Sequence, residues 1–358
     1  MISKNKLAIV TSFPPGTGIF RFADNLAHFG FFSNTLYFKS LANKLMANSP
    51  AEYKTIAPNV IPEKLSYILS FHFPSNWSKE IEKYSYVHVV SPDFFHLSRF
   101  KKSIIGTVHD LYFLNNDTRK DYTWYYRFFE KRDLDYCYNL LGLTTISKNT
   151  DKLLNHFYPK IKSKVIHHWT PDYFSKIDRI NCRDTLSIPK SKFVLLNVSF
   201  NSSNKNLEFL GNLMDSLSND YLLIHIGNSD ILCKNPDRVL NINKYLEDQA
   251  LVKYYNSADL YLAPSTSEGF NYPVIEALNC GIPVLGSDIE IFKEVLMNSP
   301  YLIQLDLLKW KETILSLNDK KAYKNATEWY SFKIGDYYRE ERGKTQFMDF
   351  YDSLGVNI

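Results

Sequence analysis

The sequence predicts an α/β protein built from two doubly wound domains, on three observations. At 358 residues the chain is too long for one ordinary hydrophobic core. Short apolar runs alternate with amphipathic stretches, which is typical of parallel sheets whose strands are joined by helices. These runs fall into two series, separated by a connection at Thr170–Lys192 that contains Pro171 and Pro189.

The first series of runs predicts the sheet of an N-terminal domain. Leu7–Ser12 is a strand-length apolar run, Pro14–Gly18 is a loop of proline and glycine, and Phe20–Phe29 has helical spacing. Further strands are predicted at Tyr67–Phe71, Tyr86–Val90, Ser103–Val108, Leu143–Ile146 and Lys164–His168. Between two of these strands, an aromatic and basic mixture predicts a helix over Tyr122–Leu140.

The second series predicts another parallel sheet and a terminal helix. Its strands are expected at Phe193–Val198, Tyr221–Ile226, Val239–Ile242, Leu260–Ala263, Pro283–Leu285 and Tyr301–Ile303. The amphipathic segment Ile334–Leu354 predicts a helix. We therefore expect domains over residues 1–170 and 171–335, with residues 336–358 forming a helix that packs back on the first domain. In sheets of this kind, ligands bind outside the carboxyl ends of the strands.

One segment of the second series is especially informative. It reads Ser267-Glu268-Gly269-Phe270-Asn271-Tyr272-Pro273-Val274-Ile275-Glu276-Ala277-Leu278. Proline suits the first turn of a helix, where its missing N–H would have no partner. We therefore expect a helix that begins near Tyr272 or Pro273, with Glu268 in the preceding loop and Glu276 about one turn inside. The next residues, Asn279–Leu285, indicate a glycine at the helix C-terminus and then a buried strand.

The two glutamates suit a ligand that carries both phosphate and hydroxyl groups. A helix N-terminus offers backbone N–H groups and the positive end of the helix dipole, which bind phosphate. An acid beside it would repel the ligand unless hydroxyls were also present, because an ionised carboxylate only accepts hydrogen bonds. A diphosphate flanked by two sugars meets both demands. The competing interpretation is a capped helix with an acid in its first turn and no ligand; the joint pattern favours the ligand.

Charge is unevenly distributed along the chain. Residues 1–170 hold 22 Lys/Arg against 13 Asp/Glu, a net of +9, and the remainder holds 20 against 25, a net of −5. A basic first half suits either an anionic partner, such as a membrane surface or an acidic acceptor, or a solvated face without a partner. The four cysteines are scattered, and no apolar run approaches the ~18–20 residues that span a bilayer. We expect a reduced, cytoplasmic protein, peripheral at the inner face of the membrane if the basic half binds one.

The spacing Glu268-x7-Glu276 resembles the signature of retaining nucleotide-sugar glycosyltransferases of family 4. Those enzymes have the glycosyltransferase B (GT-B) fold, in which two Rossmann-like domains face each other across a cleft. Other segments resemble the family along nearly the whole chain: a glycine loop, a strand that ends in histidine, the strand before the inter-domain region and a basic motif. In that order they are Pro14–Gly18, Ile105–Asp110, Thr144–Ser147 and Asn204–Leu207.

The resemblance implies three catalytic residues and a donor site. His109 would touch the sugar or the reacting centre, Lys205 would neutralise charge on the leaving diphosphate, and Glu268 would hold the transferred sugar. Glu276 would accept hydrogen bonds from the nucleotide ribose. The complete set of implied donor-binding residues is Gly16, Gly18, Asn206, Tyr245, Leu246, Gly269, Phe270, Asn271, Tyr272 and Glu276. An exposed loop lysine and a histidine that merely caps a turn are the alternatives for Lys205 and His109.

Within the donor site, the resemblance assigns backbone groups as well as side chains. Amides near Asn271 and Tyr272 would bind the diphosphate, with help from Gly16 or Gly18 in the other domain. Backbone near Tyr245 would contact the base, and backbone around Gly269 and Phe270 would contact the sugar.

The chain departs from the family at two positions. The family commonly has an arginine a few residues before the basic-motif lysine, but Val198–Ser203 contains no arginine and no glycine. An arginine fork binds phosphate with a geometry that lysine cannot copy. Either another cation, such as Arg21, replaces it, or the diphosphate is held less strongly. Asn271 also stands where the family often has glycine.

The resemblance implies hexose transfer from a UDP- or GDP-sugar to an acceptor hydroxyl, with retention of configuration, in glycan, glycolipid or polysaccharide synthesis. We expect no metal ion and no other cofactor. Asp133-Leu134-Asp135 matches the Asp-x-Asp string of metal-dependent transferases of the other major fold, but it lies in a helical pattern and is expected on an exposed helix face. The alternatives are a nucleotide-sugar epimerase on the same fold and a non-catalytic donor-binding subunit.

The acceptor is expected to be a sugar or a lipid-linked sugar, and no nucleic-acid partner is expected. The aromatic and basic stretch Tyr122–Phe129 suits either a membrane interface or core packing with one wet edge.

Overall fold

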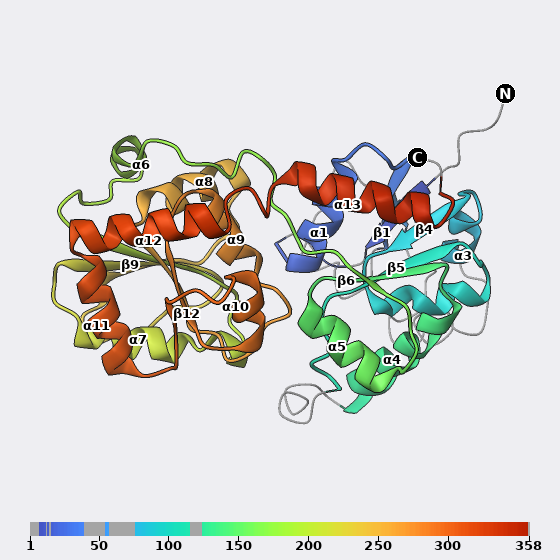
Figure 1. Cartoon of the computed structure of the whole chain (residues 1–358), viewed down its shortest axis with the longest axis horizontal. Coiled ribbons are helices and arrows are strands. Elements are labelled where there is room, and N and C mark those ends of the chain that lie inside the picture. The colour runs from blue at the N-terminus through green and yellow to red at the C-terminus, as the bar shows by residue number, and fades with distance from the viewer. Residues whose placement is uncertain are drawn as a thin grey trace. The chain divides into compact units, whose positions relative to one another are not determined.

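The structure is a computed structural model that describes residues 7–11, 13, 16–38, 54–56, 76–114 and 124–356. The chain divides into two compact units: unit 1 is Met1–His168 with Gly343–Ile358, and unit 2 is Trp169–Arg342. Each unit contains a parallel sheet with helices on both faces (Figure 1). The predicted fold class, α/β with two Rossmann-like doubly wound domains, is confirmed.

The sheet of unit 1 has the strand order β3-β2-β1-β4-β5-β6-β7 within the described residues. The strands are β1 (Leu7–Thr11), β2 (Asn34–Phe38), β3 (Lys54–Ile56), β4 (Tyr86–Val89), β5 (Ile104–Val108), β6 (Gly142–Thr145) and β7 (Lys164–Val165). The helices are α1 (Gly18–Ala27), α3 (Asn76–Ile81), α4 (Trp124–Leu134), α5 (Lys148–Phe157) and α13 (Glu340–Ser353), with 3₁₀ turns η2 (Pro92–Arg99) and η4 (Asp135–Asn139). The chain builds outward from β1 and then returns to β4, so the topological switch point lies between these two strands.

A buried polar link joins α13 to this sheet. His88 on β4 lies 2.7 Å by its Nδ1 from the Tyr351 hydroxyl and 2.8 Å by its Nε2 from Thr107 Oγ1. Burial lowers the pKa of His88 to about 3, so the ring is neutral inside the unit. The C-terminal helix is therefore connected to the core of unit 1 by hydrogen bonds as well as by apolar packing.

The sheet of unit 2 has the order β10-β9-β8-β11-β12-β13. Its strands are β8 (Phe193–Val198), β9 (Tyr221–Ile226), β10 (Val239–Ile242), β11 (Leu260–Ala263), β12 (Val284–Ser287) and β13 (Leu302–Ile303). Its helices are α6 (Arg179–Thr185), α7 (Leu207–Ser216), α8 (Asp248–Ser257), α9 (Tyr272–Asn279), α10 (Glu290–Val295), α11 (Leu307–Leu317) and α12 (Lys320–Lys333), with 3₁₀ turns η5 (Ser203–Lys205) and η6 (Pro236–Arg238). Here the switch point lies between β8 and β11.

Some predicted elements differ from the observed ones. The strand predicted at Tyr67–Phe71 lies outside the described residues, and β2 and β3 were not predicted. The helix predicted over Tyr122–Leu140 corresponds to α4 followed by the tighter turn η4. The terminal helix begins at Glu340 rather than Ile334, because Gly335, with a φ of +44°, ends the preceding helical segment.

The prediction that Asp133 lies on an exposed helix face is wrong. Its side chain is fully buried, and its Oδ1 lies 2.7 Å from Nδ1 of the equally buried His96. The hydrogen bond thus links α4 to η2. It also offsets the cost of burying the carboxyl group, which needs a hydrogen-bonding partner in a core. Across the described ranges, no group of three or more His, Cys, Asp or Glu residues is arranged to hold a metal ion.

Candidate active site

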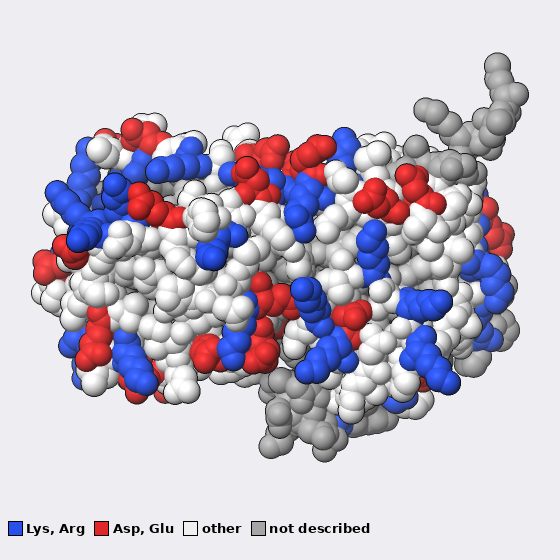
Figure 2. Space-filling view, viewed as in Figure 1, with Lys and Arg blue, Asp and Glu red and all other residues white. Residues whose placement is uncertain are grey.

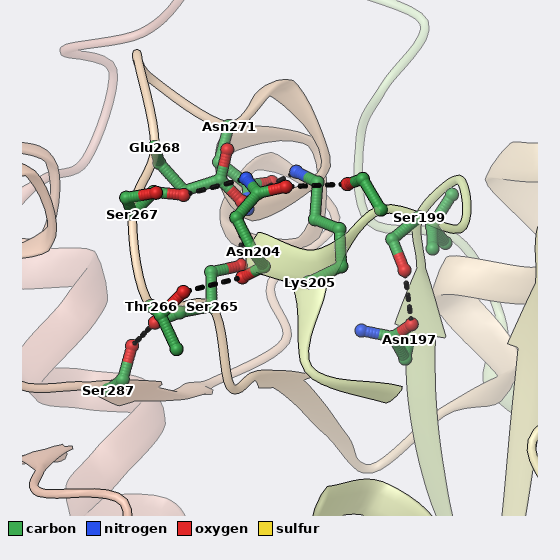
Figure 3. Close-up of polar contacts among 12 residues, drawn as sticks. Asn197, Ser199, Asn204, Lys205, Ser265, Thr266, Ser267, Glu268, Asn271 and Ser287 are labelled. Carbon is green, nitrogen blue, oxygen red and sulfur yellow. Dashed lines mark hydrogen bonds and ion pairs between the residues drawn. The ribbon is translucent and has the colours of Figure 1, made fainter. Parts of the chain in front are cut away.

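Two loops meet at the switch point of unit 2. Residues 199–206 follow β8 and residues 264–271 follow β11, and these strands are parallel neighbours, so the loops leave the same edge of the sheet. Asn204 joins them: its carbonyl accepts from the Thr266 N–H at 2.8 Å, and its Nδ2 donates to the Ser267 carbonyl at 2.8 Å (Figure 3). The loops are therefore held together by backbone-directed bonds before any ligand is considered.

Lys205 and Glu268 are in direct contact at this junction. Lys205 Nζ lies 2.5 Å from Glu268 Oε1, and the same oxygen accepts from Ser265 Oγ at 2.6 Å and from Asn271 Nδ2 at 2.9 Å (Figure 3). Only 7% of Glu268 is exposed. A buried carboxylate needs such donors to offset its desolvation. Two of the three predicted catalytic residues, 63 positions apart, are thus brought together.

The helix that follows Glu268 has the predicted boundaries. α9 begins at Tyr272 with Pro273 in its first turn. It ends at Asn279, and Gly281 adopts a φ of +75°, which lets the chain reverse toward β12. The predictions of a helix start near Pro273 and a glycine at the C-terminus are confirmed.

Glu276 lies about one turn inside α9, as predicted, and is 1% exposed. Its Oε2 accepts a hydrogen bond of 2.7 Å from the hydroxyl of Tyr255 on α8. The sequence analysis did not find Tyr255. It lies 21 positions earlier, in a helix with ordinary amphipathic spacing, so no short-range pattern connects it to the glutamate. The sequence analysis also missed Ser265 as a donor to Glu268. Its position three residues earlier is a local signal that could have identified it.

The other predicted donor residues of unit 2 lie on the same edge of its sheet. The Phe270 side chain packs against Tyr338, with 5.7 Å between ring centroids, so backbone of Gly269 and Phe270 is what remains for the predicted contact with a sugar. Asn206 has a φ of +53° and its Nδ2 donates to the Pro264 carbonyl at 3.3 Å. The predicted base contacts follow β10 at the edge of the sheet, where Tyr245 is 64% exposed; they are Tyr245 and Leu246.

Near the place where the family has arginine, the carboxyl ends of β8 and β9 and the loop after β8 carry a small polar cluster. Asn197 Oδ1 accepts from Ser199 Oγ at 2.8 Å and lies 3.0 Å from Nδ1 of the buried His225. Burial lowers the pKa of His225 to about 4, so this ring is neutral and supplies no positive charge near neutral pH. Substitution of the missing arginine by Arg21, which lies on α1 of unit 1, stays a prediction.

In unit 1, His109 directly follows β5 and is 6% exposed. Its ring packs against Phe22 and His168, with centroids 5.0 Å and 5.3 Å away. Burial lowers the pKa of His109 to about 3. A hydrogen bond with the Val90 backbone acts in the opposite direction but is weaker. Its Nε2 is buried and has no hydrogen-bond partner among the described residues. A neutral imidazole in this position has one nitrogen left for a ligand.

The predicted glycine loop follows β1 at the switch point of unit 1. Gly16 has a φ of +92°, a conformation that favours glycine, and Gly18 is the first residue of α1. Between them Thr17 caps the helix, its Oγ1 accepting from the Phe20 N–H at 3.3 Å. Pro14 and Pro15 lie outside the described residues. The roles of these residues, and of the donor residues in unit 2, toward a ligand stay predictions.

Comparison with known proteins identifies the second unit. Residues 178–303 match the family model described as Glycosyl transferases group 1. Unit 2 contains a group 1 glycosyltransferase domain. This domain includes Lys205, Glu268 and Glu276, so the candidate site lies within the part of the chain that carries the family pattern.

Curated relatives of this glycosyltransferase domain match parts of the chain. The O-antigen chain mannosyltransferase RfbU of Salmonella typhimurium is 26% identical over 231 residues, which cover 59% of this chain and 60% of that protein. The alpha-galactosylglucosyldiacylglycerol synthase of Streptococcus pneumoniae is 26% identical over 121 residues, covering 34% of this chain and 32% of that protein. The matches thus span between about a third and three-fifths of these relatives.

Solved structures resemble the whole chain. A sucrose-phosphate synthase from Thermosynechococcus elongatus superposes with a TM-score of 0.78 at 16% identity, covering 98% of this chain and 99% of that one. Anabaena Alr3699/HepE in complex with UDP and glucose gives 0.76 at 12% identity, covering 98% of this chain and 100% of that one. At such identities the likeness shows the fold, which is the GT-B fold.

Proposed function

We propose that the protein is a retaining glycosyltransferase of family 4 that transfers a hexose from a UDP- or GDP-sugar to an acceptor hydroxyl. The observation that carries the proposal is the contact between Lys205 and Glu268 at the switch point of a group 1 glycosyltransferase domain. An ammonium group and a carboxylate there suit the two halves of a nucleotide-sugar, since one compensates diphosphate charge and the other accepts bonds from sugar hydroxyls.

The proposed reaction needs no nucleophile from the protein. The bond from the anomeric carbon to the diphosphate oxygen breaks, the bond to the acceptor oxygen forms on the same face, and the acceptor proton passes to the leaving diphosphate. Lys205 has three N–H donors, so it can keep its bond to Glu268 Oε1 while donating to the diphosphate. The N-terminus of α9 adds positive potential at the same place. Together they make a metal ion unnecessary in this proposal.

The acceptor in this proposal is a sugar or a lipid-linked sugar. Support comes from the relatives, because one is named for O-antigen chains and another for a glycosylated diacylglycerol. A nucleotide-sugar donor is supported by the structures of HepE with UDP and glucose and with UDP-glucose. We place the reaction in the synthesis of a glycan, glycolipid or polysaccharide.

A donor screen tests the proposal. The full chain is incubated with UDP-glucose, UDP-galactose, UDP-N-acetylglucosamine, GDP-mannose and GDP-glucose in the presence of EDTA. Thermal shift reports binding, and released nucleoside diphosphate reports slow hydrolysis of the donor. We expect one donor to stabilise the protein and to be hydrolysed slowly without metal. No shift with any of these donors would contradict the proposal, and turnover abolished by EDTA would contradict metal independence.

A matched pair of variants tests the site itself. Glu268→Gln keeps the size of the side chain but removes its charge, and we expect transfer to fall at least about a hundredfold. The fold should be retained with a lowered melting temperature, because Lys205 loses its charged partner. Glu290→Gln is the control. It makes the same chemical change on α10, where the Glu290 side chain is 77% exposed. Undiminished turnover in Glu268→Gln would remove the assigned role. A wild-type protein that binds a donor without turning it over with any acceptor would instead be a donor-binding subunit.

A further inference from the structure

Asn271 has a backbone conformation with a positive φ, which most residues other than glycine adopt only at a cost in free energy. Its φ and ψ are both 82°, in the region that favours glycine. It is the N-cap residue of α9, a position where asparagine usually accepts a hydrogen bond from an N–H of the first helical turn. Here the side chain makes no capping bond. The backbone conformation therefore permits asparagine, which tolerates a positive φ better than most residues other than glycine, but neither it nor helix capping uses the carboxamide.

The side chain of Asn271 is turned toward Glu268 instead. Its Nδ2 donates to Glu268 Oε1 at 2.9 Å (Figure 3). Because a carboxylate only accepts hydrogen bonds, the atom that faces it must be the amide nitrogen, and this settles the orientation of the carboxamide. The other amide atom, Asn271 Oδ1, is buried and has no hydrogen-bond partner within the described part of the chain. A buried acceptor without a partner is unfavourable unless a ligand donates to it.

Glu268 is left with one free acceptor in the same place. Its Oε1 is occupied by Lys205, Ser265 and Asn271. Within the described residues no hydrogen bond reaches its Oε2. Glu268 Oε2 and Asn271 Oδ1 are therefore two acceptor atoms to which no described residue donates. The hydrogen bond from Asn271 Nδ2 to Glu268 Oε1 connects the two side chains that carry them. Neighbouring hydroxyl groups on a sugar ring are donors with the required chemistry.

We infer that Asn271 is a specificity-determining residue for the transferred hexose. Its Oδ1 accepts a hydrogen bond from one sugar hydroxyl while Glu268 Oε2 accepts from a neighbouring hydroxyl, so the configuration of the two hydroxyls is read together. This inference rests on the proposed transferase function. A site built to bond a hydroxyl rejects the epimer that points it elsewhere, because the epimer leaves a buried polar atom unpaired.

The decisive variant is Asn271→Gly, which tolerates the positive φ and removes only the carboxamide. Donors are compared as epimer pairs that share a nucleotide: UDP-glucose with UDP-galactose, and GDP-mannose with GDP-glucose. We expect the ratio of kcat/KM for the preferred sugar over its epimer to fall about five- to tenfold, the value of one hydrogen bond. Affinity for free UDP or GDP should not change. Asn298→Gly is the matched control, since Asn298 is an exposed asparagine at a φ of +55° outside the site.

A second variant separates the two halves of the carboxamide. Asn271→Asp keeps an acceptor oxygen but replaces the donor to Glu268 by a like charge. We expect its overall rate to fall while the epimer ratio is retained. The inference is overturned if Asn271→Gly leaves the ratio unchanged, if it weakens free nucleotide and all sugars equally, or if Asn271→Asp loses the ratio as fully as glycine does. Failure of the wild-type protein to bind any donor would count against the proposed function instead.

Discussion

At the scale of single residues, buried polar groups in this protein meet their desolvation cost in two ways. Glu268 and Asp133 are buried acids with direct hydrogen-bonding partners, Lys205 and His96 among them. His88 and His109 are buried as neutral rings, because burial lowers the pKa of each to about 3. The first solution supplies each buried carboxyl group with hydrogen-bonding partners. The second makes folding depend on pH.

The pH dependence has a definite sign for His88. Its pKa is about 3 in the folded protein and 6.5 in the unfolded chain, so below pH 6.5 the unfolded state binds one more proton. The free energy of unfolding should therefore fall as pH falls from 6.5 toward 3, by up to about 1.4 kcal/mol per pH unit from this ring. We expect His88→Gln, which can still bond Tyr351 and Thr107, to show a shallower loss than the wild type.

Urea unfolding at about pH 6, 5 and 4 measures this slope for both proteins. His156→Gln serves as the control, because His156 is an exposed histidine at the end of α5 in the same unit. Equal slopes for His88→Gln and the wild type would show that His88 does not remain neutral in the folded protein.

At the scale of elements, close packing decides where the sequence tolerates change. Gly211 lies inside α7, where alanine would ordinarily be the better helix former. A Cβ at this position would lie 2.2 Å from the carbonyl oxygen of Leu232, which is backbone and cannot rotate away. The loop after β9 therefore approaches the helix more closely than any side chain permits.

We expect Gly211→Ala to lower the free energy of unfolding by about 1–3 kcal/mol, since overpacking outweighs the gain in helix propensity. The shift in the midpoint denaturant concentration between the variant and the wild type measures the change in free energy of unfolding. Asn212→Ala is the matched control, because Asn212 is the exposed neighbour on the same helix and should be neutral or slightly stabilising. A Gly211→Ala protein as stable as the wild type would mean that the loop moves away at little cost.

At the scale of the whole molecule, the basic first half includes a surface that suits an anionic membrane. Exposed aromatic residues of unit 1 include Phe128 on α4, Tyr138 on η4 and Phe157 at the end of α5. Exposed Lys148 and Lys152 lie on α5, and Figure 2 shows Lys and Arg side chains over this part of the unit. No helix in the described ranges is long and apolar enough to cross a bilayer. From these exposed aromatic and cationic side chains we propose that unit 1 binds the surface of an anionic membrane.

Vesicle co-sedimentation tests this surface. We expect binding to anionic vesicles at low salt that weakens as salt is added, because exposed charges are screened. The double variant Lys148→Gln/Lys152→Gln should weaken binding about tenfold or more, since each lysine near the surface contributes about 1 kcal/mol. Lys320→Gln/Lys321→Gln makes the same charge change on α12 of unit 2 and should bind as the wild type does. No binding to anionic vesicles at low salt would end the proposal.

The elements that were predicted correctly carry their own local signals. α9 is bounded by Pro273 in its first turn and by Gly281 after its last residue, and both act through the conformation of one or two residues. The strands β8, β9, β11 and β12 of unit 2 are apolar runs that are largely buried on both faces of a parallel sheet. β2, in contrast, reads Asn34–Phe38 with two polar residues first, and β3 has only three residues, so neither resembles a buried run.

The sequence alone determined the fold class, the two series of strands and the helix of the two glutamates, because periodicity, proline and glycine act over a few positions. The candidate site residues came from the family resemblance of those same segments. Only the tertiary structure decided which of these residues meet. Lys205 reaches Glu268 because β8 and β11 are neighbours at a switch point, and the fold brings Tyr255 on α8 within hydrogen-bond distance of Glu276 on α9. The burial of Asp133 against His96 was decided in the same way. These contacts join residues 21 to 63 positions apart, and no local pattern reports which loops and helices a folded sheet will bring side by side.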